Sequence, residues 1–314
     1  METTHPTYAL VFPGQGSQFI GMADAWSTHP AGKRVLEEAS DSLGSDIWAG
    51  SHDEDAMART AFVQPALLAC GVAAFEVLRA EGLSETAIVG VAGHSLGEFA
   101  ALVAAGVLTL PQALQVVVIR GAAMQRAGEE RPGTMSALLG VGTADAEGLC
   151  DQARQDDVLL VANQNSPAQV VISGSVPAIE RAEALAQERK IRAIRLNVAG
   201  AFHSPLMEPA AEPIIATLGG FEFGMPRFPI AENVTGQLVR DPAQIRELLG
   251  RHVLSPVLWE SCARSLAAAG ATTFVECGAG DVLTKLAKRV VPDARATAVG
   301  SPEAARALIA EPAA

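Results

Sequence analysis

The sequence predicts an α/β fold in which a mainly parallel sheet is combined with a small inserted subdomain. Three short apolar runs, at 8–12, 87–95 and 272–278, each end in a glycine-rich turn. Parallel strands deliver their following loops to one edge of a sheet in this way, and sites are built at that edge. Long stretches rich in Ala and Leu, at 65–81 and 97–107, have the length and composition of helices.

The middle of the chain shows a different order of elements. Strand-like runs at 134–142, 158–175 and 189–200 are separated by helical stretches at 143–155 and 176–188. The second run contains the turn sequence Asn-Ser-Pro and therefore predicts two strands joined as a hairpin. The resulting order, β-α-β-β-α-β, is that of a ferredoxin-like unit.

This middle segment divides the chain into two predicted domains. Strands of the main sheet occur on both sides of it, as expected for an insertion. We expect a larger domain formed by residues 1–130 and 201–314, and a ferredoxin-like subdomain formed by residues 131–200. A chain of 314 residues that is 49% hydrophobic and 18% charged has ample apolar content for a sizeable core.

Charge, cysteine usage and hydropathy exclude several classes of protein. The formal net charge of -12 argues against a general affinity for nucleic acid. The four cysteines are widely separated, and no His, Cys or Asp spacing predicts a metal site. No apolar run reaches the roughly 18 residues of a membrane span, and the N-terminal segment lacks the features of a secretion signal. We therefore expect a soluble, cytoplasmic protein that acts without nucleic acid or membrane.

Ser95 lies in the pattern G-x-S-x-G, between Gly93 and Gly97. A strand precedes the pattern and a helix follows it, which is the arrangement of a nucleophile elbow. The first-turn N–H groups of such a helix can face a developing oxyanion. The bare pattern also occurs by chance, so a plain turn serine is the alternative.

A serine nucleophile needs a base, and His203 has the most suitable position for one. It follows a strand, in the glycine-containing loop NVAGAFHSPLM. Among the other histidines, His94 adjoins Ser95, and neighbours at a tight turn usually point apart, so we expect a structural contact there. A surface histidine without a catalytic part is the alternative for His203.

Two further features suggest a ligand. The loop FPGQGSQ, residues 12–18, has two glycines directly after a strand but lacks phosphate-loop spacing. It predicts either an oxyanion donor or a tight turn. Arg120 lies in the middle of an apolar helix, where an unpaired charge would be very costly. Its partner is either an internal acid, for which Glu98 is one candidate, or a substrate carboxylate bound through two parallel hydrogen bonds.

Together these motifs resemble one family, the malonyl-CoA:acyl-carrier-protein transacylases with the related acyltransferase domains of polyketide and fatty-acid synthases. The motifs occur in the family's order over nearly the whole chain: FPGQGSQ (12–18), QPALLA (64–69), GHSLGE (93–98), RGAAMQ (120–125), NSPAQVVISG (165–174), GAFHSPLM (200–207), SPVLW (255–259) and ECGAGDVLTKLAKR (276–289). The resemblance implies an α/β-hydrolase-like larger domain with a ferredoxin-like insertion. It also implies transfer of a malonyl group from malonyl-CoA to the phosphopantetheine thiol of an acyl carrier protein. The reaction would be ping-pong, through a malonyl-serine ester, with no metal or redox cofactor.

The resemblance assigns roles to individual residues. Ser95 would be the acylated nucleophile and His203 the base that accepts and later returns its proton. The backbone N–H groups of Gln15 and Leu96 would form the oxyanion hole. Arg120 would pair with the free carboxylate of the malonyl group.

Three more positions complete the set: two follow from the same resemblance, and Asn165 is expected apart from it. His252 matches the position whose backbone carbonyl orients the catalytic histidine, where many relatives have Gln. Phe202 would narrow the pocket against an α-methyl branch, as in malonyl-selective members. Asn165 is expected near the pocket.

The carrier protein is acidic in this family and so is this chain, so docking requires a local positive patch. Lys285, Lys288 and Arg289 lie on about one helical face, and the segment 189–195 offers a second group of basic residues. Solvated surface faces without a docking role are the alternative for both.

Three other functions stay open at this point. The first is a stand-alone polyketide-pathway acyltransferase that uses another acyl unit. A serine thioesterase or esterase would place a catalytic acid between the serine and the histidine. Asp145, Asp151 and Glu180 lie in that interval, but within the predicted insertion. A non-enzymatic subunit that only docks partners is the third possibility. The sequence does not separate fatty-acid from polyketide carriers, and it does not give the oligomeric state.

Overall fold

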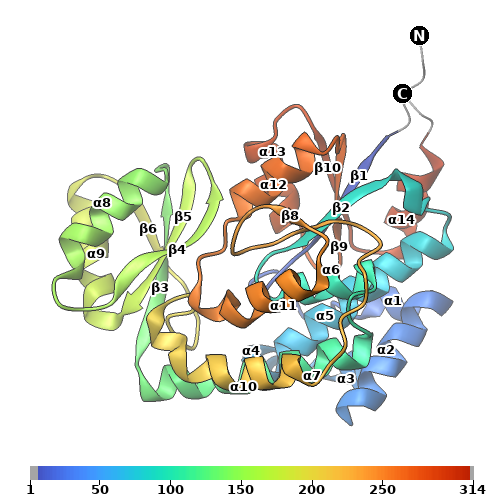
Figure 1. Ribbon diagram of the computed structural model, residues 1–314, viewed down its shortest axis with the longest axis horizontal. Coiled ribbons are helices and arrows are strands. Elements are labelled where there is room, and N and C mark those ends of the chain that lie inside the picture. Colours follow the sequence, from blue (N-terminus) through green and yellow to red (C-terminus); the bar gives the residue numbers. More distant parts are fainter. Residues whose placement is uncertain (1–5, 312–314) are drawn as a thin grey trace.

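The computed structural model describes residues 6–311 and contains two β-sheets in adjacent parts of the molecule (Figure 1). The larger sheet has the strand order β10-β9-β1-β2-β7-β8. Its strands are β1 (Tyr8–Phe12), β2 (Ile88–Gly93), β7 (Ile230–Ala231), β8 (Leu238–Val239), β9 (Thr273–Cys277) and β10 (Arg295–Val299). All of its pairs are parallel except β7 with β8.

Both faces of this sheet are covered, which explains the continuous apolar runs of its central strands. Along β1, Leu10 and Phe12 belong to one buried cluster, while Ala9 and Val11 belong to a second cluster on the opposite face. The first cluster is formed with α2 (Pro30–Leu43), α5 (Thr60–Ala80), α6 (Gly97–Ala105), α7 (Leu110–Glu130), α10 (Glu208–Gly219), α11 (Pro242–Arg251) and α14 (Pro302–Ala310). The second is formed with α12 (Trp259–Ala268) and α13 (Val282–Val290).

Short elements connect these layers. They are α1 (Asp24–Ser27), α3 (Ile47–Gly50), α4 (Glu54–Ala58) and the 3₁₀ helices η1 (Glu85–Ala87), η2 (Pro205–Met207) and η3 (His252–Leu254).

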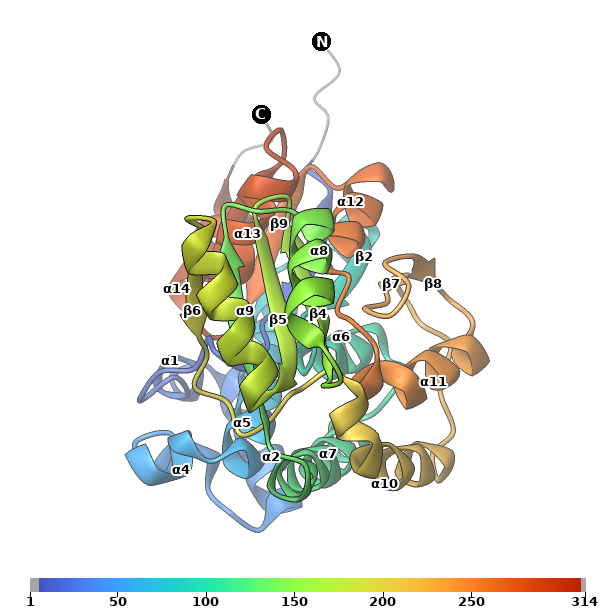
Figure 2. The ribbon, with the colours of Figure 1, turned by 90° about the vertical axis from the view of Figure 1, so that its left-hand side faces the viewer.

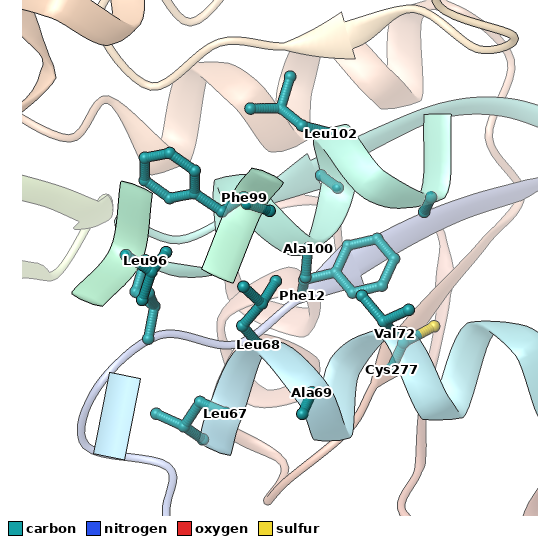
Figure 3. Close-up of a cluster of buried hydrophobic side chains, with 14 of the residues drawn as sticks. Phe12, Leu67, Leu68, Ala69, Val72, Leu96, Phe99, Ala100, Leu102 and Cys277 are labelled. Atoms are coloured by element: carbon teal, nitrogen blue, oxygen red, sulfur yellow. The ribbon is translucent and has the colours of Figure 1, made fainter. Parts of the chain in front are cut away.

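Helix α5 is a core helix of the larger domain. By length and composition, this helix could cross a membrane. The expectation that no apolar segment reaches the length of a membrane span was therefore wrong on this criterion. However, 83% of its most apolar window is buried inside the protein. Figure 3 shows side chains of α5, among them Leu68 and Val72, gathered with Phe99 of α6 and with Phe12. Burial against neighbouring elements therefore accounts for the apolar character of this helix.

The smaller sheet has the order β4-β5-β3-β6 and is antiparallel throughout. Its elements follow one another along the chain as β3 (Gly133–Leu139), α8 (Thr143–Arg154), β4 (Leu159–Ser166), β5 (Gln169–Ser175), α9 (Val176–Glu188) and β6 (Arg192–Arg195). The two helices cover one face of this sheet, which Figure 2 turns toward the viewer, and share a separate apolar core with it.

The predicted α/β fold with a parallel sheet and a ferredoxin-like unit is therefore confirmed. The smaller unit falls within the predicted span 131–200, and the ends of the predicted larger domain, 1–5 and 312–314, lie outside the described residues. The strand predicted over 189–200 is shorter, because only residues 192–195 pair with β3. Strands β7, β8 and β10 were not predicted, the first two being only two residues long.

The two sheets are linked next to the candidate site. Val257, just before α12, donates its N–H to the carbonyl of Ala162 at 2.8 Å, and Gln164 donates its N–H to the carbonyl of Val257 at 2.9 Å. Strand β4 thereby gains a parallel bridge to the larger domain. This edge of the small subdomain is held against the carboxyl ends of the main strands.

Candidate active site

Ser95 occupies the turn between β2 and α6 in a backbone conformation that favours glycine, with φ of 50°. The turn is tight because strand and helix nearly touch. A Cβ on Gly93 would lie 1.9 Å from the carbonyl carbon of Gly97, and a Cβ on Gly97 would lie 2.0 Å from the carbonyl oxygen of Phe12. Such strained positions recur at functional sites when the surroundings hold them. The strand, turn and helix present the hydroxyl of Ser95 to a cavity.

The Ser95 hydroxyl and the His203 ring lie within hydrogen-bonding distance, with 2.8 Å between Oγ and Nε2. The other ring nitrogen, Nδ1, lies 3.0 Å from the carbonyl oxygens of both His252 and Ser255. Because two carbonyls can only accept, Nδ1 carries the ring proton and Nε2 presents its lone pair to Ser95. Like Ser95, His203 has a positive φ, of 57°.

His203 is neutral in this environment. Its side chain is buried, and burial together with the positive charge of Arg120 lowers its pKa to about 3. A neutral imidazole aimed at a hydroxyl can take the proton when the oxygen attacks an electrophile.

Arg120 extends from α7 into the cavity and is only 1% exposed. It donates from Nη2 to Ser95 Oγ and from Nη1 to Gln64 Oε1, both at 2.9 Å. Within residues 6–311 no carboxylate forms an ion pair with it; the candidate partner Glu98 influences it only at longer range. Burial lowers the pKa of Arg120 to about 10, so the guanidinium is still charged at neutral pH. In the part of the chain that the structure describes, a buried cation thus faces the cavity without an acidic contact.

Two backbone N–H groups beside the nucleophile are available as donors. Gln15 and Leu96 both line the cavity, and in the described part of the chain neither N–H has an acceptor. The loop that contains Gln15 packs directly on the elbow, since a Cβ on Gly14 would lie 2.3 Å from the carbonyl oxygen of His94. The side chain of Leu96 is buried in the core.

The cavity has a volume of about 550 Å³, and both domains line it. Phe202, next to the base, forms part of its wall, as do Met135 and Val171 of the small sheet. Strand β4 contributes Asn163 and Asn165, where its register is irregular against β5. Irregular register of this kind re-aims side chains at the edge of a sheet.

His94 is held by the small subdomain. Asn165 Oδ1 lies 2.8 Å from His94 Nε2, and the His94 ring packs against Trp259 with 5.6 Å between ring centroids. This is the structural contact expected for His94. It also places Asn165 on the cavity wall.

The three basic residues of α13 are not in the cavity. Val282, Leu283 and Leu286 of this helix line the cavity, whereas Lys285, Lys288 and Arg289 lie on its exposed face. Lys285 Nζ lies 2.7 Å from Asp281, and Arg289 donates to Gln169. The second basic segment is partly neutralised, because Arg195 forms a two-pronged pair with Glu183.

The acids that an esterase would need are remote from the histidine. Asp145, Asp151 and Glu180 are all exposed on α8 and α9. Among the described residues, no acidic side chain hydrogen-bonds to the His203 ring, whose Nδ1 is occupied by backbone carbonyls.

Three residues of the site were not predicted as site residues. Gln64 links Arg120 to Gln15, Ser255 supplies the second carbonyl to His203, and Asn233 Oδ1 accepts the Ser95 N–H at 2.8 Å. Gln64 and Ser255 lie in motifs that carry the family resemblance, which was a usable signal. No signal in the sequence indicated Asn233, because its contact with Ser95 spans 138 residues of sequence.

Within residues 6–311 no group of three or more His, Cys, Asp or Glu side chains could hold a metal ion. All four cysteines are buried and free.

The fold and the geometry, a serine hydroxyl beside a neutral imidazole and two backbone N–H donors, are those expected of an acyl-transfer class of enzyme. Comparison with known proteins agrees with this class. A family model described as "Acyl transferase domain" matches residues 9–306, and the chain belongs to this family.

Individual relatives match over nearly their full length. The chain is 39% identical to the malonyl CoA-acyl carrier protein transacylase of Salmonella typhimurium, covering 97% of this chain and 99% of that protein. A solved malonyl-CoA:acyl carrier protein transacylase from Xanthomonas oryzae pv. oryzae is 40% identical with a TM-score of 0.91, over 97% of this chain and 98% of the other. A malonyl-transacylase solved in complex with its type II PKS acyl-carrier protein is 38% identical with a TM-score of 0.91, over 95% and 97%.

Proposed function

We propose that this protein transfers a malonyl group from malonyl-CoA to the phosphopantetheine thiol of an acyl carrier protein. The observation that carries the proposal is the buried guanidinium of Arg120, which touches Ser95 Oγ and has no acidic partner in contact among the described residues. An acyl group that is esterified to Ser95 and ends in a carboxylate would supply that partner through two parallel hydrogen bonds. The names of the relatives, malonyl CoA-acyl carrier protein transacylases, agree with this choice of acyl group.

In the first half-reaction, Ser95 Oγ attacks the thioester carbonyl carbon of malonyl-CoA while its proton passes to His203 Nε2. The carbonyl oxygen becomes an oxyanion, which the N–H groups of Gln15 and Leu96 stabilise. When the carbon–sulfur bond breaks, His203 returns the proton to the sulfur and CoA-SH leaves. The product is a malonyl ester of Ser95.

The second half-reaction repeats these steps with another thiol. The phosphopantetheine thiol gives its proton to His203 and attacks the ester carbonyl, again with the oxyanion on the same two N–H groups. The carbon–oxygen bond breaks, and Ser95 Oγ takes the proton back from His203. Every step uses groups of this chain and of the two substrates, so we propose that the reaction needs neither a metal nor a redox cofactor.

Supporting residues keep this machinery in place. The carbonyls of His252 and Ser255 fix the His203 ring in the tautomer that leaves Nε2 free. Phe202 narrows the space beside the acyl chain, and Asn165 fixes His94 at the cavity wall.

The carrier protein would approach over α13. This helix lines the cavity with its apolar face and turns Lys285, Lys288 and Arg289 to the solvent. A positive patch is needed because both the protein, at -12, and the carriers of this family are acidic. The relative solved with a type II PKS acyl-carrier protein supports a polyketide carrier as one candidate.

We place the protein in the cytoplasm. Its four cysteines are free and buried, which suits a reducing compartment, and its apolar helix α5 is a core helix.

Mass spectrometry of the acyl-enzyme tests the function. After incubation with malonyl-CoA, the intact protein should gain one malonyl group, mapped to the peptide that contains Ser95. The peptide that contains Ser17, a second serine lining the cavity, should stay unmodified. The S95A variant should gain nothing, and addition of a holo carrier protein should move the group from the wild-type enzyme to the carrier.

The same experiment discriminates the other functions. Release of free malonate instead of transfer to the carrier would identify a thioesterase. Absence of any covalent adduct would leave a docking protein. Parallel incubations with methylmalonyl-CoA and acetyl-CoA, and with fatty-acid and polyketide carriers, give the acyl unit and the carrier.

A further inference from the structure

Behind the nucleophile elbow lies a cluster of buried polar side chains that the transfer steps do not use. It comprises Glu98 on α6, Glu232 and Asn233 after β7, and His252 in η3. Each of these residues is at most 1% exposed. Buried acids are rare and have to be neutralised or paired, so this cluster requires an explanation.

Asn233 connects the cluster to the reacting serine. Its Oδ1 accepts the Ser95 N–H at 2.8 Å, and its Nδ2 donates to the carbonyl of Gly93 at 2.7 Å. Its own backbone N–H donates to Glu98 Oε2 at 3.2 Å. Asn233 therefore hydrogen-bonds to both sides of the turn that holds Ser95 at its positive φ, and Glu98 holds the backbone of Asn233 in place.

His252 contacts the same groups. Its Nε2 lies 3.4 Å from Asn233 Oδ1 and 3.5 Å from Glu98 Oε2, while its Nδ1 has no partner in the described residues. Because Nε2 faces two acceptors, it carries the hydrogen, and burial keeps the ring neutral by lowering its pKa. His252 thus contacts Glu98 with its ring, and it orients His203 with its backbone carbonyl.

Three carboxyl oxygens of the cluster receive no hydrogen bond from any residue in the range 6–311. These are Glu98 Oε1 and both side-chain oxygens of Glu232. Glu98 and Glu232 lie close enough for each to shift the pKa of the other, and burial raises the pKa of both. Two carboxylates in such contact cannot both be ionised, because neither can donate and their charges repel in a buried site. One proton between them resolves this problem.

We propose that Glu98 and Glu232 form an acid pair that shares one proton, with Glu232 as the donor and Glu98 as the carboxylate, and that this pair is a positioning element for Ser95. Glu98 is the carboxylate because it accepts the Asn233 N–H, and because the positive charge of Arg120 favours its ionised form. In the free enzyme this single negative charge also balances Arg120 at longer range. Glu232 supplies the hydrogen bond that keeps Glu98 in place.

The groups that face the pair are consistent with one negative charge. They are Arg120 from α7, neutral His252 from η3 and Cys262 from α12, whose Sγ lies 3.4 Å from the Glu232 carbonyl. Burial and the neighbouring acids hold the pKa of the Cys262 thiol well above its ordinary range, so it brings no second anion.

The pair also predicts a pH dependence of stability. Burial and the adjacent Glu98 hold the pKa of Glu232 well above the ordinary 4.5. The folded protein then retains a proton that the unfolded chain releases above pH 4.5. Between that pH and the folded pKa, the equilibrium constant for unfolding should rise with pH by up to about tenfold per unit.

Infrared difference spectroscopy tests the proton directly. At about pH 8, where exposed carboxyl groups are ionised, the wild-type protein should show the carbonyl stretch of a protonated carboxylic acid, and E232Q should lack it. Glu276 offers a matched control, because it is equally buried but accepts N–H bonds from Leu283 and Thr284 on both oxygens. E276Q should keep the band. Absence of the band from the wild type, or its persistence in E232Q, would overturn the proposal.

Two further measurements separate positioning from general support of the fold. E232A should slow acylation of Ser95 by malonyl-CoA about tenfold or more, and E232Q, which keeps a donor, should restore most of the rate. Denaturant unfolding of E232Q should lack the pH dependence described above. Equal losses of rate in E232A and E232Q would contradict positioning by a hydrogen bond. The kinetic test rests on the proposed function, whereas the spectroscopic and unfolding tests hold whatever the enzyme transfers.

Discussion

We call the buried part of the cavity around Ser95 and Arg120 the floor, and the exposed basic face of α13 the mouth. The two carry charges of the same sign in very different surroundings. Arg120 at the floor is buried beside Ser95, whereas Lys285 at the mouth is 65% exposed and already paired with Asp281. Interactions between charges are strong where water is excluded and weak where solvent and salt screen them. The floor should therefore decide which acyl group reacts, and the mouth only how often a partner arrives.

The largest effect is expected at the floor. R120A should lower kcat/KM for malonyl-CoA about 100-fold, since it removes hydrogen bonds to a charged group, while acetyl-CoA is affected much less. Steady-state rates with the two thioesters give the comparison. Arg126, exposed on the same helix, provides the control variant R126A, which should change neither. A malonyl rate in R120A that is intact, or that rises relative to acetyl, would rule out a carboxylate site.

An intermediate effect is expected at the wall. F202A should raise kcat/KM for methylmalonyl-CoA relative to malonyl-CoA about tenfold, because the space for one extra methyl group is worth roughly 1–3 kcal/mol. Competition between the two thioesters, read by the mass of the acyl-enzyme, measures the ratio. An unchanged ratio would mean that Phe202 does not set the width of the pocket.

The smallest effect is expected at the mouth. The double variant K285E/K288E should raise KM for the carrier protein by about three- to tenfold at low salt and less at high salt. Acylation by malonyl-CoA alone should be unchanged. K33E is a matched control for the single variant K285E, since Lys33 is an exposed lysine of α2 that does not line the cavity and both changes alter the net charge equally. A carrier KM that responds equally to both variants would assign the effect to net charge rather than to α13.

Local patterns in the sequence predicted the elements that depend on neighbouring residues. The Ser95 elbow follows from two glycines and a strand–helix boundary, and the structure places that boundary between residues 93 and 97. The α/β class follows in the same way from apolar runs that end in glycine-rich turns.

Features that depend on residues far apart in the chain could not be predicted from local patterns. Asn233 was not predicted because an asparagine after a two-residue strand has no pattern of its own. The ring of His252 was not predicted either, because its contacts with Glu98 and Asn233 join segments that are far apart in the chain. The pairing of Lys285 with Asp281 was readable, since the two lie four residues apart on one helix.

The strand order also has a consequence for the newly made chain. β1 lies between β2 and β9, so the first strand to be synthesised gains its second neighbour only when residues 273–277 emerge. Ser95 and Arg120 are translated well before His203 and the carbonyls of His252 and Ser255 that orient it. Domains generally fold as units during synthesis. Until residues 252–255 have been made and the two domains have folded, Ser95 lacks an oriented imidazole, so unfinished copies of the chain are expected to be inactive.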